Sequence, residues 1–182
     1  MAVTSTVPVH RLSVEDVLAM VRAGILDEHA RVELEDGVLV DMNPIGPEHE
    51  DTLALLTRHF VAGTPSQVQV RVQGMLLTPG GGYVMPDLSV IAQPSRSELP
   101  ATASLVVEVA QTSQARDREK AALYAAAGVP EYWIVDVVAQ VLTVHRDPAG
   151  GTYRSISEHR DGSVTPALKG VPPVELDAIF GR

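Results

Sequence analysis

Two apolar stretches, PDLSVIA at residues 86–92 and LVVEVA at residues 105–110, decide the fold class. Each has the length and composition of a β-strand, and the second is apolar on both faces apart from its glutamate, as is typical of a central strand. The loop of about a dozen residues between them is long enough for an antiparallel return. The start of the first strand then lies beside the end of the second, so we expect Asp87 and Glu108 to be neighbours on one side of the sheet.

The flanking sequence predicts an α+β domain whose central mixed sheet is flanked by helices. Capping residues, helical spacing and breakers predict helices from Ser13 to about Arg22, from about Glu48 to Phe60, and from Asp117 to Ala126. Alternation and turn residues predict a hairpin at 31–42, a strand at 68–73 continued by MLLT, a turn at 80–82, strands at 131–137 and 141–146, and β-like pieces such as 153–158. We expect one domain over residues 1–182, with a core at about 12–155 and a tail at 156–182 of unclear role.

Composition restricts the class of function. A chain of 182 residues can bury roughly 70% of the surface that its unfolded form exposes. There is no cysteine, so a metal ion must bind to oxygen or imidazole. The net charge of −9 argues against a protein dedicated to coating nucleic acid, but it does not exclude an enzyme that cuts it. No stretch has the composition of a secretion signal or a membrane span, so we expect a cytoplasmic protein.

Glu108 lies within a strand that is otherwise apolar, where an unpaired carboxylate loses several kcal/mol of solvation. A second carboxylate at Asp87 makes ionisation of Glu108 harder still. A divalent cation between them turns this repulsion into joint coordination, which is the physical reason to expect Mg²⁺ or Mn²⁺. The alternative is a structural ion pair of Glu108 with Arg71 or Arg116.

Lys120 lies on the helix that follows the Glu108 strand, on a face shared with Asp117, Ala121 and Tyr124. From there its ammonium group can reach back toward the carboxylates, orient a water molecule and counter the charge on an attacked phosphate. Taken alone, the spacing favours a surface ion pair between Asp117 and Lys120, and a packing role for Tyr124.

These residues resemble a known family. Pro86-Asp87 followed by Glu108 resembles the Pro-Asp…(Asp/Glu)-x-Lys signature of the restriction-endonuclease-like superfamily, and the surrounding sequence is similar to its Uma-two endonuclease branch. The likeness runs from about Leu12 to Tyr153. Its matching pieces are VELEDG (32–37), MNPIGPEH (42–49), MPDLSV (85–90), LVVEV (105–109) and DREKAALYAAAGVPEYWIVD (117–136).

The resemblance implies a restriction-endonuclease-like fold and a metal-dependent endonuclease, with DNA as the expected substrate and a homodimer as the expected assembly. Asp87 and Glu108, with the Val109 carbonyl, would bind Mg²⁺ or Mn²⁺. Lys120 would act on the attacking water, and Glu33 would contribute nearby. One departure is Ala110, which stands where the superfamily often has its lysine. The similarity of DREK to the branch suggests that the lysine has moved to the helix.

Several readings stay open at this stage. Glu33 precedes an acidic Asp-Gly turn, so a solvated role competes with one beside the metal. His49 can contact substrate, or it can cap or pack the helix that begins near it. The aromatic stretch at 132–135 is expected in the core, and the other five histidines show no ligand spacing. The rival functions are a non-catalytic nuclease fold that binds nucleic acid or protein, and a metal-dependent hydrolase of a small phosphoester.

Overall fold

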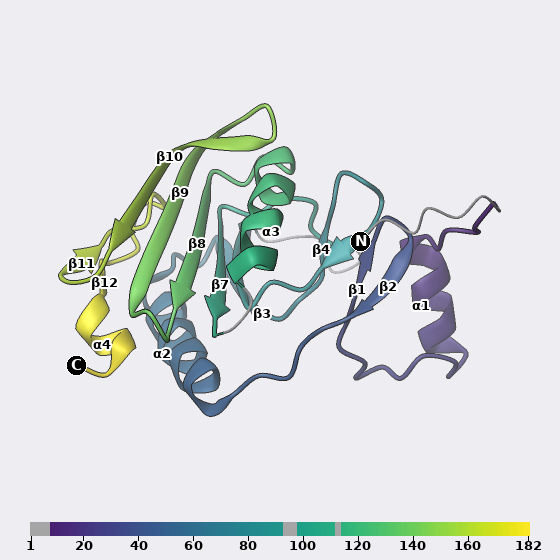
Figure 1. Cartoon of the computed structure of the whole chain (residues 1–182), viewed down its shortest axis with the longest axis horizontal. Helices are drawn as coiled ribbons and strands as arrows, with labels where there is room; N and C mark the ends of the chain where they lie inside the picture. Colours follow the sequence, from purple (N-terminus) through teal and green to yellow (C-terminus); the bar gives the residue numbers. More distant parts are fainter. Residues whose placement is uncertain (1–7, 93–97, 112–113) are drawn as a thin grey trace.

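The computed structural model describes residues 8–92, 98–111 and 114–182, with the backbone alone for 114–118. The strands of the described chain form a six-stranded sheet, a smaller four-stranded sheet and a C-terminal pair of short strands (Figure 1). The elements are α1 (Val14–Arg22), β1 (Val32–Glu35), β2 (Val38–Asp41), α2 (Pro47–Gly63), β3 (Val68–Val72), β4 (Leu76–Leu77), β5 (Tyr83–Val84), β6 (Leu88–Ala92), β7 (Leu105–Ala110), α3 (Gln114–Ala126), β8 (Glu131–Asp136), β9 (Val141–Ala149), β10 (Thr152–His159), β11 (Ser163–Val164), β12 (Val174–Glu175) and α4 (Leu176–Phe180).

The large sheet has the strand order β10-β9-β8-β7-β6-β3. Strands β7 and β8 are parallel and all other neighbours are antiparallel, so the sheet is mixed. Strand β7 is interior and all of its residues are buried. The predicted α+β class and the central place of the Glu108 strand are therefore confirmed.

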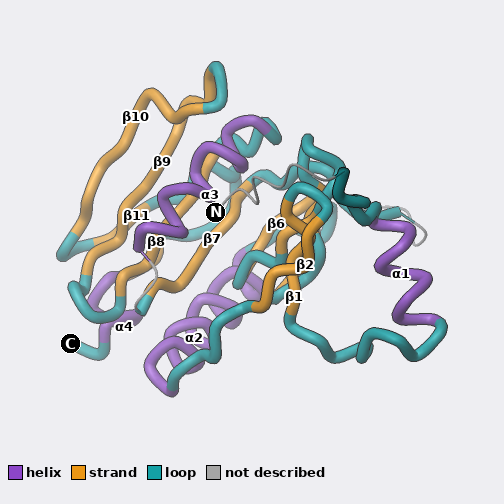
Figure 2. The backbone as a smooth tube through the Cα atoms, turned by 45° about the vertical axis from the view of Figure 1, so that its right-hand side comes forward, coloured by secondary structure: helices purple, strands orange, loops and turns teal. Residues whose placement is uncertain are grey.

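The two faces of β7 pack against different helices. Leu105, Val107 and Val109 lie in one cluster with Phe60 of α2, whereas Val106 and Ala110 lie in another with Tyr124 of α3. Alternate residues of a strand point to opposite faces, so α2 and α3 cover opposite sides of the sheet. In Figure 2, β7 runs between these two helices.

The smaller sheet, of order β2-β1-β5-β4, was not predicted as a separate sheet. Its β1–β2 hairpin was predicted, and it turns at Asp36 and Gly37, both with positive φ, as a two-residue hairpin loop requires. The expectation that MLLT continues the strand before it is wrong. Gln73 has a φ of 48° directly after β3, and β4 then pairs with β5 in the smaller sheet.

Two of the predicted boundaries that shift lie beside the Pro-Asp motif and at the start of the helix that carries Lys120. The strand that carries the Pro-Asp motif begins at Leu88, so Asp87 lies just before β6. Helix α3 begins at Gln114 and not at Asp117. No helix in the described part of the chain is both long and apolar enough to span a membrane.

The tail after β10 contributes to the main core. Its segments place five side chains in the cluster that α2 and β7 form: Val164, Val171, Val174, Leu176 and Ile179. The buried carboxylate of Glu131 ties this tail to the sheet, because it accepts hydrogen bonds from Arg146 and from the Ala167 N–H.

Candidate active site

The β6–β7 ladder ends at the pair Leu88 and Val107. Beyond that pair β7 continues beside β8 alone, from Glu108 to Ala110. Asp87 and Glu108 therefore lie where the two strands diverge. Because both strands are interior, the site is at the end of a ladder and not on an edge strand of the sheet.

The two carboxylates are neighbours, as predicted. The Asp87 N–H donates to Glu108 Oε2 at 3.2 Å, and the Val109 N–H donates to Asp87 Oδ2 at 2.9 Å. Asp87 is 6% exposed and Glu108 is 5% exposed. Each carboxylate thus accepts a backbone hydrogen bond from the other's segment, which holds the pair together where the ladder ends.

Lys120 points into this site. Its Nζ donates to Glu108 Oε1 at 3.1 Å and to Glu33 Oε1 at 2.9 Å, and its side chain is 12% exposed. Burial alone would lower the pKa of Lys120, but the charges of Glu108 and Glu33 outweigh burial and raise that pKa above its ordinary value. Lys120 is therefore a fixed cation.

Glu33 is brought to the site by the smaller sheet. It is 1% exposed, and it accepts a hydrogen bond from the Met85 N–H at 3.0 Å as well as the one from Lys120. The reading of Glu33 as a solvated turn residue is wrong. The ion pair with Lys120 places β1 of the smaller sheet against α3 of the main body.

Tyr124 is a site residue that sequence reasoning assigned to packing. Its hydroxyl donates to Glu108 Oε1 at 2.7 Å, and the residue is fully buried. The sequence feature that could have predicted this role is the position of Tyr124 four residues after Lys120, on the same face of the helix. The pKa of Glu108 is raised to about 7. Burial is the largest cause and the charge of Asp87 adds to it, while Lys120 and the Tyr124 hydrogen bond oppose the rise.

Asp87 is held by two side chains besides the Val109 N–H. His49 Nε2 lies 2.9 Å from Asp87 Oδ2, and Gln73 Nε2 donates to Oδ1 at 3.3 Å. Burial would raise the pKa of Asp87, but these hydrogen bonds and the His49 ring lower it below its ordinary value. Nothing in the sequence pointed to Gln73.

His49 does not cap α2. The N-cap residue is Gly46, which has no side-chain capping bond, and His49 is buried with its Nε2 on Asp87. Its Nδ1 has no hydrogen-bond partner among the residues that the structure describes. The structure thus places His49 behind a site carboxylate, where it can fix the orientation of Asp87.

The structure tests one part of the alternative prediction, in which Glu108 forms an ion pair with Arg71 or Arg116. Among the interactions of the described residues, the charged partner of Glu108 is Lys120, and no ion pair joins it to Arg71. The side chains of Arg116 and Asp117, which sequence reasoning named as possible ion-pair partners, lie outside the described residues.

The residues present suit a hard divalent cation. Asp87 and Glu108 offer adjacent carboxylate oxygens, and burial together with the charge of Asp87 raises the pKa of Glu108 despite the Lys120 ammonium. Within the described ranges, no three His, Asp or Glu side chains are placed to hold a metal ion together. A cation here would depend on the two carboxylates and on a backbone oxygen such as that of Val109.

A mixed sheet with two carboxylates where antiparallel strands diverge, and a lysine beside them, defines a restriction-endonuclease-like protein. The family model Uma2, described as "Putative restriction endonuclease", matches residues 14–178, and the chain belongs to this family. This confirms the resemblance found in the sequence.

Structural comparison agrees on the fold. A crystal structure described as a "putative nuclease belonging to DUF820 from Anabaena variabilis" is similar, with a TM-score of 0.76 and 13% sequence identity, over 93% of this chain and 98% of that one. No curated protein matches the chain. The family supports a nuclease function, and this neighbour supports the fold.

Proposed function

We propose that this chain is an endonuclease that hydrolyses phosphodiester bonds of DNA with the help of Mg²⁺ or Mn²⁺. The observation that carries the proposal is the meeting of Asp87 and Glu108 at the divergence of β6 and β7, with the Lys120 ammonium 3.1 Å from Glu108. The family assignment supports the same chemistry.

Asp87 and Glu108, with the Val109 carbonyl, would hold the cation. When bound, the cation supplies positive charge that polarises the scissile phosphate and favours deprotonation of water. It also removes the repulsion between the two buried carboxylates, which gives a stability readout for binding that is independent of turnover.

Lys120 stays protonated, so it does not serve as the general base. Its Nζ has three donors, of which two are directed at Glu33 and Glu108. The remaining N–H can orient the attacking water or stabilise charge on the phosphate oxygens. Glu33 therefore acts by fixing Lys120 in place.

Nicking and linearisation of supercoiled plasmid test the proposal. The wild type, Asp87→Asn and Lys120→Ala are each assayed in Mg²⁺, in Mn²⁺ and in EDTA. The control is Asp161→Asn, which changes an exposed aspartate that is not one of the candidate site residues. We expect cutting that needs the metal, survives in the control and is lost in both site variants. Equal cutting by all four proteins would reveal a contaminant, and no cutting by the wild type would refute the proposal.

A thermal-shift titration separates metal binding from catalysis. Mg²⁺ or Mn²⁺ should raise the unfolding temperature of the wild type but not that of Asp87→Asn, because a ligand that binds only the folded state stabilises it. A shift without plasmid cutting would favour a small phosphoester as substrate. Neither a shift nor cutting would favour the non-catalytic module.

A further inference from the structure

Arg31 directly precedes β1 and extends the hairpin of the smaller sheet by one residue. The Met42 N–H donates to the Arg31 carbonyl at 2.9 Å, in the same register as the β1–β2 pairs. Alternate residues of an extended chain point to the same face, so Arg31 lies on the face of the hairpin that carries Glu33. This face is directed at the candidate active site, because Glu33 contacts Lys120.

Arg31 also lies toward the end of the smaller sheet from which the chain enters the site. Strands β1 and β5 are antiparallel, with Leu34 opposite Tyr83. In an antiparallel pair, a step back along one strand corresponds to a step forward along the other. Arg31 precedes Leu34, and Asp87 follows Tyr83. Arg31 and Asp87 are therefore displaced in the same direction from that pair.

The guanidinium group of Arg31 has no partner in the described part of the chain. Its Nε is enclosed by protein atoms and forms no hydrogen bond. A buried donor without a partner costs free energy, so a folded protein that keeps one calls for an explanation. The residue as a whole is only partly buried, and its two Nη groups are neither enclosed nor bonded within the described residues. The open end of the guanidinium group can thus bind a ligand that arrives from solvent.

A nuclease site of this kind needs such a cation. Binding of DNA draws on the neutralisation of phosphates by Lys and Arg, and this chain has a net charge of −9. Lys120 directs two of its three donors at Glu33 and Glu108, which leaves one for the substrate. The planar guanidinium group of an arginine matches two oxygens of a phosphate. Arg31 therefore has the chemistry that a DNA strand beside Lys120 requires.

We propose that Arg31 binds a phosphate of the DNA strand next to the scissile phosphate and so positions that strand over the site. The inference rests on the proposed nuclease function and adds a residue that holds the substrate. Residues two apart on an extended strand are about 7 Å apart, so Arg31 lies about that far along the hairpin from Glu33, which holds Lys120. This is close to the spacing of successive phosphates in a DNA strand, so Lys120 and Arg31 can contact neighbouring phosphates.

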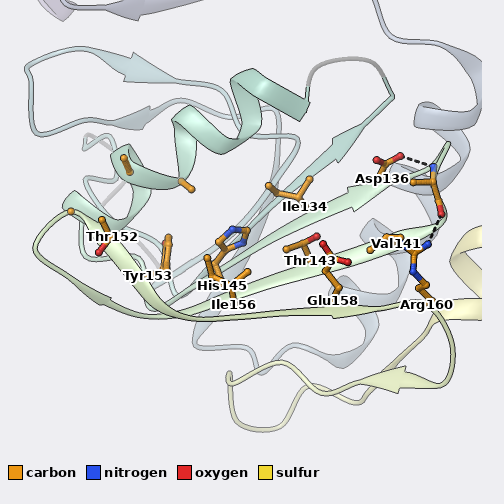
Figure 3. Close-up of a pocket in the computed structure, with 14 residues that line it drawn as sticks. Ile134, Asp136, Val141, Thr143, His145, Thr152, Tyr153, Ile156, Glu158 and Arg160 are labelled. Carbon is orange, nitrogen blue, oxygen red and sulfur yellow. Dashed lines mark hydrogen bonds between the residues drawn. The ribbon is translucent and has the colours of Figure 1, made fainter.

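Binding of a short fluorescent duplex, measured by anisotropy over a series of NaCl concentrations, tests the inference. Arg31→Met removes the charge and keeps most of the length, whereas Arg31→Lys keeps the charge without the planar group. The control is Arg160→Met, which changes an exposed arginine in a cavity of about 520 Å³ over β8, β9 and β10 (Figure 3). One series contains EDTA, which prevents metal-dependent cutting, and a second contains Ca²⁺ as a divalent cation for the carboxylates.

We expect Arg31→Met to weaken binding about tenfold or more, as for the loss of a hydrogen bond between charged groups. The slope of the logarithm of the binding constant against the logarithm of the salt concentration should become shallower by about 0.9, because one phosphate contact is lost. Arg31→Lys should keep the slope, and Arg160→Met should keep both slope and affinity. The unfolding temperature of Arg31→Met should equal or exceed that of the wild type, because a buried donor without a partner has been removed.

Three results would overturn the inference and leave the proposed nuclease standing. The first is a wild-type slope for Arg31→Met. The second is an equal decrease of the slope in Arg160→Met, which would mean that total charge matters and not a contact at Arg31. The third is an unfolding temperature of Arg31→Met well below that of the wild type, which would give Arg31 a structural role. A wild type that neither binds the duplex nor cuts plasmid would instead refute the nuclease proposal, and this inference with it.

Discussion

Replacing Lys120 with methionine removes a cation that contacts both Glu33 and Glu108. The two ion pairs have N–O distances of 2.9 and 3.1 Å, and the carboxylate side chains are 1% and 7% exposed. Methionine has nearly the same length and is apolar, so the substitution leaves the shape of the site and changes its charge. Two buried carboxylates then lose the lysine as a counter-ion.

The expected loss is large. Removal of one partner from a buried ion pair costs about 3–5 kcal/mol, because the remaining charge stays buried and uncompensated. For a chain of this size each kcal/mol lowers the unfolding temperature by about 2–4 °C, so a decrease of roughly 6–20 °C is expected. The control is Lys169→Met, which changes the other lysine of the chain, an exposed one.

Urea denaturation in EDTA at pH 8 measures the difference. Adding Glu33→Gln to Lys120→Met removes one of the two carboxylate charges that have lost the lysine, so the double variant should be more stable than Lys120→Met alone. A loss of less than about 1 kcal/mol, typical of an exposed ion pair, would refute the reasoning. So would a double variant that is no more stable than the single one.

Three further substitutions have defined outcomes. Tyr124→Phe removes the hydrogen bond to Glu108 and should cost about 1.5–3 kcal/mol in urea denaturation, as expected for a bond to a charged group. Burial lowers the pKa of His145 below its ordinary value of 6.5, so the folded state favours the neutral ring. The contribution of His145 to stability is therefore complete above pH 6.5 and is lost as the pH falls below it. In a pH series of unfolding temperatures, His145→Gln should make this decrease less steep. Leu176→Ala, in the tail and fully buried, should cost about 2–5 kcal/mol by calorimetry, whereas a tail outside the core would tolerate it.

The parts of the fold that local patterns determine were predictable. The strands on either side of the site have continuous apolar runs. The dipeptide Asp36-Gly37 is a strong sequence signal for a two-residue hairpin loop. The antiparallel return followed from loop length, and with it the contact of Asp87 with Glu108. These features depend on residues close in sequence or on a register that the apolar pattern fixes.

The parts that depend on contacts between distant segments were not predictable. Gln73 reaches Asp87 only because a positive φ ends β3 and turns its side chain toward the site. Strand β5 has two residues, too few to show alternation, and it pairs with β1 from far along the chain. The tail lacks long periodic segments, so its role in the core depends on single apolar residues that meet α2 in space.

The position of Ala110 explains how a lysine on a helix can serve a site in β7. Residues 108 and 110 point to the same face of the strand, toward α3, because side chains alternate along a strand. Ala110 is 1% exposed and packs in one cluster with Tyr124 and Ala125, so its small side chain lets the helix lie close to the strand. That close approach brings Lys120 and Tyr124 within hydrogen-bonding distance of Glu108. A long cationic side chain at position 110 would occupy the same space as the helix. The small residue in the strand and the lysine on the helix therefore depend on each other.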